Sequence, residues 1–340
     1  MMAIAGSLTA VVLLLSVQGC GTTADATTDA VGPTPAAALK VFNSYVTANK
    51  VAVANRDQLL AESLTSSAQF SILSSQYDIA ASTGVPVTSP SYGKPTLYVP
   101  KLTTYPQWFM AAVPEYPAHG GQPRTVVMVF DRTEASTGWT LDGTAQMASG
   151  TPALNVAVNQ EGYATALPTT DPSLEFPPDA VGATHASVVD EGPSSPAAKV
   201  VAAGPQTTGI YQTNAAYAAK IRPGHWIYTW QMEGTSFPFF ALRMTDGGAV
   251  VFYTMSLNQQ TVPAIKPPSH PKVQPPSIPV PDVYKPLLSP DQAPFIDEFD
   301  TGSTLQFLAV DPPGAKNGST ATGKLRIIGN GGGLTFAGGK

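Results

Sequence analysis

WFMAAV (residues 108–113) and TVVMVF (residues 125–130) decide the fold of this 340-residue chain. Both segments are short, apolar and rich in aromatic or β-branched residues, and a stretch with Pro, His and Gly separates them. Such segments bounded by turn residues are typical of strands in an antiparallel sheet. The neighbouring segments LYVPKL and GWTLDGTAQM extend the pattern, so we expect strands from about residue 96 onwards.

The second half of the chain repeats this pattern. PFFALR (238–243) and AVVFYTM (249–255) again combine an aromatic-rich strand, a turn and a β-branched strand. The intervening Thr245-Asp246-Gly247-Gly248 supplies the glycines that a tight hairpin requires. The similarity of the two halves predicts an internal duplication.

Helical segments precede the strands in each half. Thr34 and Pro35 are a capping hydroxyl followed by a proline at the first helical position. In the second half, residues 177–192 have a helix-forming pattern, with Pro178 near the helix start and Gly192 beyond its end, and residues 206–221 have another. We therefore predict an α+β fold with two related domains, each with helices packed on a curved antiparallel sheet.

The predicted domain boundaries follow from these segments. The first domain covers residues 35–167 and the second covers residues 168–340. The second includes a proline-rich strap at residues 263–281, whose eight prolines favour extended polyproline II structure. At the carboxyl end, the segment from Asn330 to Gly333 is glycine-rich with no Lys-Ser/Thr or helix after it, so we expect a flexible terminus and no phosphate loop.

The amino-terminal segment predicts the cellular location. Residues 1–17 carry no charge and are too short for a membrane-spanning helix, which is typical of a signal peptide (residues 1–19). Val17-Gln18-Gly19-Cys20 resembles a bacterial lipobox, in which the cysteine thiol receives a diacylglyceryl group and fatty acids such as palmitate. Small polar residues follow, so residues 20–34 are expected to be the lipidated Cys20 and a disordered tether.

Composition excludes several classes of function. Charged residues make up 12% of the chain and the net charge is −5, so no basic surface attracts nucleic acid. Cys20 is the only cysteine, which excludes a disulfide and a cysteine-based zinc site within the chain.

The order of segments resembles a family of predicted actinobacterial lipoproteins of unknown function. The resemblance lies in six short motifs: Tyr105-Pro106-Gln107-Trp108-Phe109; Glu161-Gly162-Tyr163-Ala164; Thr184-His185-Ala186; Ala241-Leu242-Arg243 with Asp246-Gly247-Gly248-Ala249-Val250-Val251; Leu305-Gln306-Phe307; and Lys324-Leu325-Arg326-Ile327-Ile328-Gly329. It implies a helix against a curved sheet in each half, a layout similar to cystatin-like and nuclear-transport-factor-like folds. It implies no activity.

Residues with catalytic or metal-binding chemistry are sparse. The four histidines form no metal-spaced pair, and no Gly-x-Ser-x-Gly nucleophile motif occurs. Asp297, Glu298 and Asp300 form an acidic cluster that is either a Ca²⁺ site or, as we prefer, a solvated turn. We expect no catalytic residue, no metal and no cofactor.

An aromatic strand is the candidate binding feature. Strand alternation places Trp226, Tyr228 and Trp230 on one face. One face of a curved sheet can line a ligand pocket, and core packing between helix and sheet explains the same pattern.

The sequence therefore predicts a non-enzymatic, lipid-anchored protein on the outer face of the cytoplasmic membrane, with a binding or scaffolding role and an unidentified ligand. One alternative is a cell-envelope hydrolase, which would need His185 or His225 beside a carboxylate. The other is the solute-binding lipoprotein of a transporter, which would need parallel βαβ units.

Overall fold

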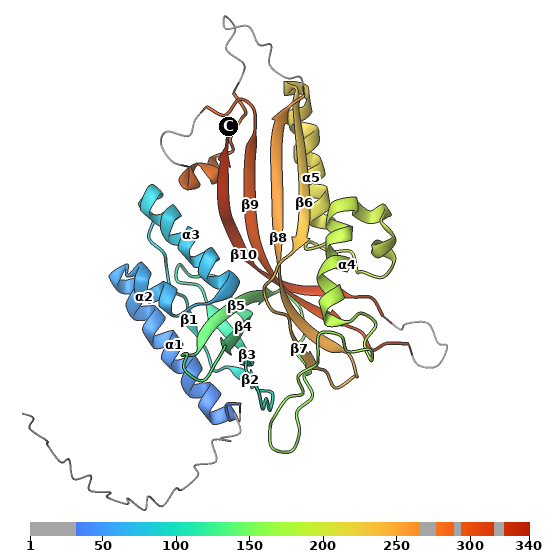
Figure 1. The fold of residues 1–340 in the computed structure, drawn as a ribbon. Coiled ribbons are helices and arrows are strands. Elements are labelled where there is room, and N and C mark those ends of the chain that lie inside the picture. The colour runs from blue at the N-terminus through green and yellow to red at the C-terminus, as the bar shows by residue number, and fades with distance from the viewer. Residues whose placement is uncertain (1–31, 265–276, 289–293, 316–322) are drawn as a thin grey trace, which may run out of the picture.

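A computed structural model describes residues 32–264, 277–288, 294–315 and 323–340. The fold is α+β, as predicted, with helices packed against a large antiparallel sheet (Figure 1). The helices are α1 (Pro35–Asn55), α2 (Gln58–Ser63), α3 (Ser67–Thr83), α4 (Pro178–Glu191) and α5 (Thr208–Ile221), with short 3-10 helices η1 (Gly192–Ser194), η2 (Pro196–Lys199), η3 (Arg222–Gly224) and η4 (Asp282–Leu287). The strands are β1 (Ser91–Tyr92), β2 (Thr96–Tyr98), β3 (Gln107–Tyr116), β4 (Arg124–Arg132), β5 (Thr140–Met147), β6 (Trp226–Gly234), β7 (Phe240–Arg243), β8 (Ala249–Pro263), β9 (Phe299–Asp311) and β10 (Arg326–Gly339).

The ten strands form one sheet in the order β1-β3-β4-β5-β10-β9-β8-β6, with β2 on β3 and β7 on β8. The two predicted hairpins are present as β3–β4 and β7–β8. Gly247 lies in the second turn with a φ of 89°, a left-handed conformation that glycine adopts without steric cost.

Local sequence accounts for the helix ends. The Thr34 hydroxyl accepts a hydrogen bond from the Ala37 N–H at 3.1 Å, and Pro35 begins α1. Helix α4 begins at Pro178 and ends before Gly192, as the sequence predicts. The sequence also has a helical pattern at residues 57–62 and 70–79, and these segments correspond to α2 and α3.

The prediction of a flexible terminus at Asn330–Gly333 is wrong. This segment is the middle of β10, which pairs along its length with β9 and briefly with β5. A Cβ atom on Gly331 would collide with the main-chain oxygen of Thr144, and one on Gly332 with that of Thr304. The glycines are therefore needed because neighbouring strands approach the β10 backbone closely.

Three apolar layers hold the sheet and helices together. Helix α1 packs through Ala38 and Phe42 on the outer face of β3 and β4, and α4 packs through Val181 and Val188 on β8 and β9. The opposite faces of both halves meet in a shared core, in which Trp108 contacts Phe240 at a ring-centroid distance of 5.2 Å.

This arrangement bears on the predicted domains. A helix lies against the sheet in each half, with α1–α3 on one side of Figure 1 and α4 and α5 on the other. The division at residues 167/168 is not confirmed, because β10, from the second half, pairs with β5, from the first. The shared core also crosses this boundary.

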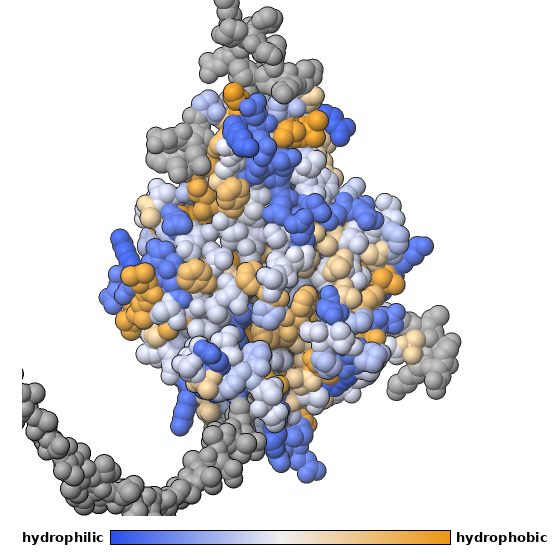
Figure 2. All heavy atoms as spheres, in the orientation of Figure 1, coloured by the Kyte–Doolittle hydropathy of each residue, from blue (hydrophilic) through white to orange (hydrophobic). Residues whose placement is uncertain are grey.

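The described helices include none that is long and apolar enough to span a membrane. Cys20 with the predicted signal peptide, and residues 265–276 of the proline-rich strap, lie outside the described residues. On the face shown in Figure 2, apolar side chains form small patches interrupted by polar ones.

Candidate functional site

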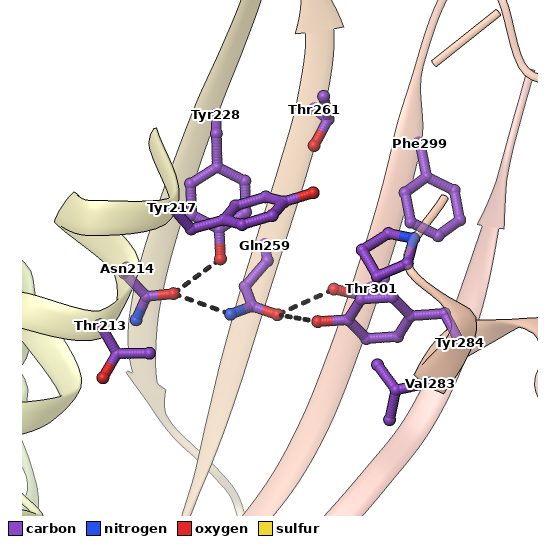
Figure 3. Close-up of a pocket in the computed structure, with 11 residues that line it drawn as sticks. Thr213, Asn214, Tyr217, Tyr228, Gln259, Thr261, Val283, Tyr284, Phe299 and Thr301 are labelled. Carbon is purple, nitrogen blue, oxygen red and sulfur yellow. Dashed lines mark hydrogen bonds between the residues drawn. The ribbon is translucent and has the colours of Figure 1, made fainter. Parts of the chain in front are cut away.

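A cavity of about 230 Å³ lies between α5, η4 and the strands β6, β8 and β9 (Figure 3). We refer to it as the α5–η4 cavity. Its lining residues are Thr213, Asn214, Tyr217, Tyr228, Gln259, Thr261, Pro281, Val283, Tyr284, Phe299 and Thr301. These residues come from segments up to 88 positions apart, so the cavity depends on the tertiary fold.

The cavity has a buried floor and an exposed rim. Asn214, Thr261 and Thr301 are at most 5% exposed. Thr213 on α5 and Val283 on η4 are exposed. The opening therefore lies between a helix and a short 3-10 helix, and the strands provide the floor.

A chain of hydrogen bonds crosses the floor (Figure 3). The Asn214 Oδ1 accepts from the Tyr228 hydroxyl at 2.6 Å and from the Gln259 Nε2 at 2.9 Å. The Gln259 Oε1 in turn accepts from the Tyr284 hydroxyl at 3.1 Å and the Thr301 hydroxyl at 3.0 Å. The network fixes both amide groups, because each amide oxygen has two donors.

Tyr228 and Tyr217 remain neutral hydroxyls at pH 7. Burial raises the pKa of Tyr228, and the nearby Tyr284 and Tyr217 raise it further. Burial also raises the pKa of Tyr217. Their rings meet edge to face at a centroid distance of 4.8 Å, so the two tyrosines form one aromatic wall.

The three aromatic residues of the predicted pocket have different surroundings. Tyr228 lines the cavity. Trp226 is 8% exposed and packs in an apolar cluster with Ile221. Trp230 contacts α4 instead, where its Nε1 donates to the Val189 carbonyl at 3.0 Å.

Sequence reasoning missed the two amides that organise the site. Asn214 is on α5 and Gln259 is on β8, and nothing in their local sequence shows that they meet. Gln259 is a half-buried amide in the polar end of β8, between the exposed Asn258 and Gln260. Such a residue needs hydrogen-bond partners, which is the signal that could have drawn attention to it.

The histidines of the hydrolase alternative are not placed beside a carboxylate in the described part of the chain. His185 is fully buried, with Nε2 against the Gln206 carbonyl and Nδ1 at 3.0 Å from the Tyr253 hydroxyl. Burial lowers its pKa to about 4, so its imidazole is neutral at pH 7. His225 is exposed, in a left-handed conformation with a φ of 63°.

Two carboxyl groups outside the cavity are deeply buried. Asp142 is 1% exposed and Asp311 is fully buried, and burial raises the pKa of each to about 7. Among the residues that the structure describes, the Asp142 Oδ2 and both Asp311 oxygens have no hydrogen-bond partner. Across the described ranges, no group of three or more His, Cys, Asp or Glu side chains is arranged to hold a metal ion.

The acidic cluster lies at the start of β9. The main-chain N–H groups of Asp297 and Glu298 donate to the Lys340 carbonyl. A hydrogen bond with Asp300 raises the pKa of Glu298, and the charge of Asp300 adds to this effect. The cluster therefore joins the beginning of β9 to the end of the chain.

Comparison with known proteins places the chain in a family. A family model described as a domain of unknown function, DUF8094, matches residues 31–339. The chain belongs to this family. The match covers every described element, and it confirms the resemblance to a family of unknown function. No curated protein and no solved structure matches the chain.

Proposed function

We propose that this chain is a lipid-anchored protein on the outer face of the cytoplasmic membrane that binds a small ligand in the α5–η4 cavity without transforming it. The observation that carries the binding role is the hydrogen-bonded floor of the cavity. Because Asn214 and Gln259 are already fixed by tyrosine and threonine hydroxyls, a ligand meets a preorganised surface.

The walls also favour binding. Aromatic and aliphatic side chains with a few convergent polar groups are the usual lining of small-molecule sites. Hydroxyl and amide groups orient a ligand by hydrogen bonding, and their neutral state at pH 7 suits recognition better than proton transfer.

The anchoring part of the proposal rests on the sequence around Cys20, with the lipobox Val17-Gln18-Gly19-Cys20 after an uncharged apolar segment. The alternative of a transporter's solute-binding lipoprotein is less well supported, because the strand pairs of the sheet are antiparallel rather than parallel βαβ units.

A small-molecule screen with a blocked variant tests the binding role. Full-length protein in detergent is mixed with fragments of varied charge, and binding is followed by saturation-transfer NMR. Thr213→Trp adds a large ring at the exposed rim, and Gln212→Trp adds the same ring one position away on α5, outside the lining. We expect fragments that bind the wild type and Gln212→Trp but not Thr213→Trp. Binding that Thr213→Trp leaves unchanged would refute the cavity as the site.

Metabolic labelling with palmitate tests the anchor. In a bacterial host that processes lipoproteins, we expect the wild type to be labelled and membrane-bound, and Cys20→Ser to be unlabelled and released from the membrane. An unlabelled wild type would contradict the anchor.

A further inference from the structure

The charges, open hydrogen-bonding positions and size of the α5–η4 cavity narrow the class of its ligand. None of the eleven described residues that line it carries a charge. A charged ligand would lose its hydration on entering and gain no opposite charge in return. The lining therefore favours an uncharged molecule.

The floor of the cavity has both hydrogen-bond donors and hydrogen-bond acceptors that a ligand could use. Each amide oxygen accepts two hydrogen bonds within the network. Among the described residues, Asn214 Nδ2 donates only to the Ile210 carbonyl and Gln259 Nε2 only to Asn214, so each nitrogen keeps a second N–H. The hydroxyls of Tyr228 and Tyr284 donate within the network and can each still accept. A hydroxyl group is both donor and acceptor, so it matches such a surface.

Two further hydroxyls face the cavity. Within the described part of the chain, the hydroxyls of Tyr217 and Thr261 have no hydrogen-bond partner. Thr261 is only 3% exposed, so a ligand hydroxyl would supply a partner that bulk water supplies poorly. The cavity thus presents donors and acceptors on its floor and on one wall.

Aromatic rings line both sides of the cavity. Tyr217 and Tyr228 stand on the α5 side, and Tyr284 and Phe299 on the η4 side, where their rings meet at 5.8 Å. The volume of about 230 Å³ is below the roughly 300–1,000 Å³ of sites for drug-sized ligands, so it suits a single ring.

We infer that the α5–η4 cavity binds a neutral cyclic polyol, the chemistry of a single uncharged sugar ring. Its C–H faces lie against the tyrosine and phenylalanine rings, and its hydroxyls bond to the amide N–H groups and to Thr261. This inference rests on the proposed binding function and adds the ligand class.

Isothermal titration and saturation-transfer NMR on the full chain test the ligand class. The neutral probes are methyl β-D-glucopyranoside and myo-inositol, the charged probes are glucuronate and glucosamine, and phenol is a flat neutral ring with one hydroxyl. We expect at least one neutral polyol to bind saturably and at least tenfold more tightly than either charged probe and phenol.

Two tyrosines of α5 form a matched pair of variants. Tyr217→Ala removes a cavity wall and its open hydroxyl, and we expect affinity for the neutral polyol to fall at least tenfold. Tyr211→Ala removes a ring of the same size that packs on Trp230 outside the cavity, and we expect unchanged affinity. Equal losses in both variants would overturn the assignment of the site. Circular dichroism shows whether each variant is folded, and Tyr217→Phe, which keeps the ring, gives a smaller loss.

The outcomes separate the ligand class from the proposed function. One outcome would be that phenol or a charged probe binds the wild type but not Thr213→Trp, while neither polyol binds. That outcome would overturn the ligand class and leave the proposed binding function intact. If no probe and no fragment binds, both fail.

Discussion

Replacing Asp311 with asparagine removes a charge from a fully buried carboxyl group at the end of β9. Neither carboxyl oxygen has a hydrogen-bond partner in the described part of the chain. Burial raises the pKa from its usual 3.8 to about 7, and the nearby Glu175 adds to the rise. The Phe176 N–H offsets part of the effect without reaching normal hydrogen-bond geometry.

The sign of the pH effect follows from the raised pKa. Between pH 4 and pH 7 the folded state keeps a proton that the unfolded chain has released, so the free energy of unfolding falls as pH rises through this window. Below pH 4 both states are protonated, and above pH 7 the loss is complete. Since one pKa unit corresponds to about 1.4 kcal/mol, the loss at Asp311 approaches about 4 kcal/mol.

Asparagine keeps the shape of the side chain without the ionisation. We therefore expect Asp311→Asn to be more stable than the wild type at pH 8.5, by up to about 4 kcal/mol, and nearly equal to it at pH 4. Urea unfolding at a series of pH values measures the difference, in which the contributions of other titrating groups cancel. Asp78→Asn, at an exposed position on α3, is the matched control and should change stability little at any pH.

A stability difference between Asp311→Asn and the wild type that does not vary with pH would refute this reasoning. Lower stability of the variant at pH 8.5 would refute it as well, because the ionised carboxylate would then be stabilising in the folded state.

Three further predictions concern a close strand contact and two buried ionisable groups. Gly331→Ala should destabilise the protein by more than about 3 kcal/mol, because the new Cβ collides with the Thr144 main-chain oxygen. In the control Gly333→Ala the new Cβ meets no atom within 4 Å, so the loss of stability should be less than about 1 kcal/mol. Thermal unfolding measures both variants, and equal losses would contradict the close approach of the strands. The pKa of His185 is about 4 in the folded state instead of 6.5, so the unfolded chain binds a proton first as pH falls, and stability is lost between pH 6.5 and pH 4. In His185→Gln this loss should be smaller. Urea unfolding between pH 4 and pH 7 measures it, and the same loss in the variant and the wild type would refute the prediction. Asp142→Asn should resemble Asp311→Asn in gaining stability at alkaline pH, and a loss there would show that the Asp142 carboxylate is needed in its charged form.

The helices and hairpins were predictable because their signals are local. The cap at Thr34, the proline at Pro35, the stop at Gly192 and the turn at Gly247 each act within a few residues of the chain. Periodicity then distinguishes helix from strand without knowledge of the tertiary fold.

Strand β10 was missed for the opposite reason. Its glycines have low strand propensity and usually indicate flexibility. Their role depends on Thr144 and Thr304, which lie on strands from distant parts of the sequence. Only the assembled sheet shows that a side chain would not fit there.

The candidate site was half predictable. Alternation along β6 predicts Trp226, Tyr228 and Trp230 on one face without distinguishing among them. In the structure Tyr228 lines the α5–η4 cavity, Trp226 packs with Ile221, and Trp230 contacts α4. Asn214 and Gln259 meet only because α5 packs against β6, which is the neighbour of β8 in the sheet. The two residues are 45 positions apart, so the hydrophobic periodicity of neither segment predicts their contact.

A crystal structure of the protein soaked with methyl β-D-glucopyranoside shows whether the α5–η4 cavity binds a sugar ring. We expect one sugar ring between Tyr217 and Tyr284, with hydroxyls within hydrogen-bond distance of Gln259 Nε2 and the Thr261 hydroxyl. A ring bound only elsewhere, or tyrosine side chains that fill the cavity in the soaked crystal, would contradict this prediction.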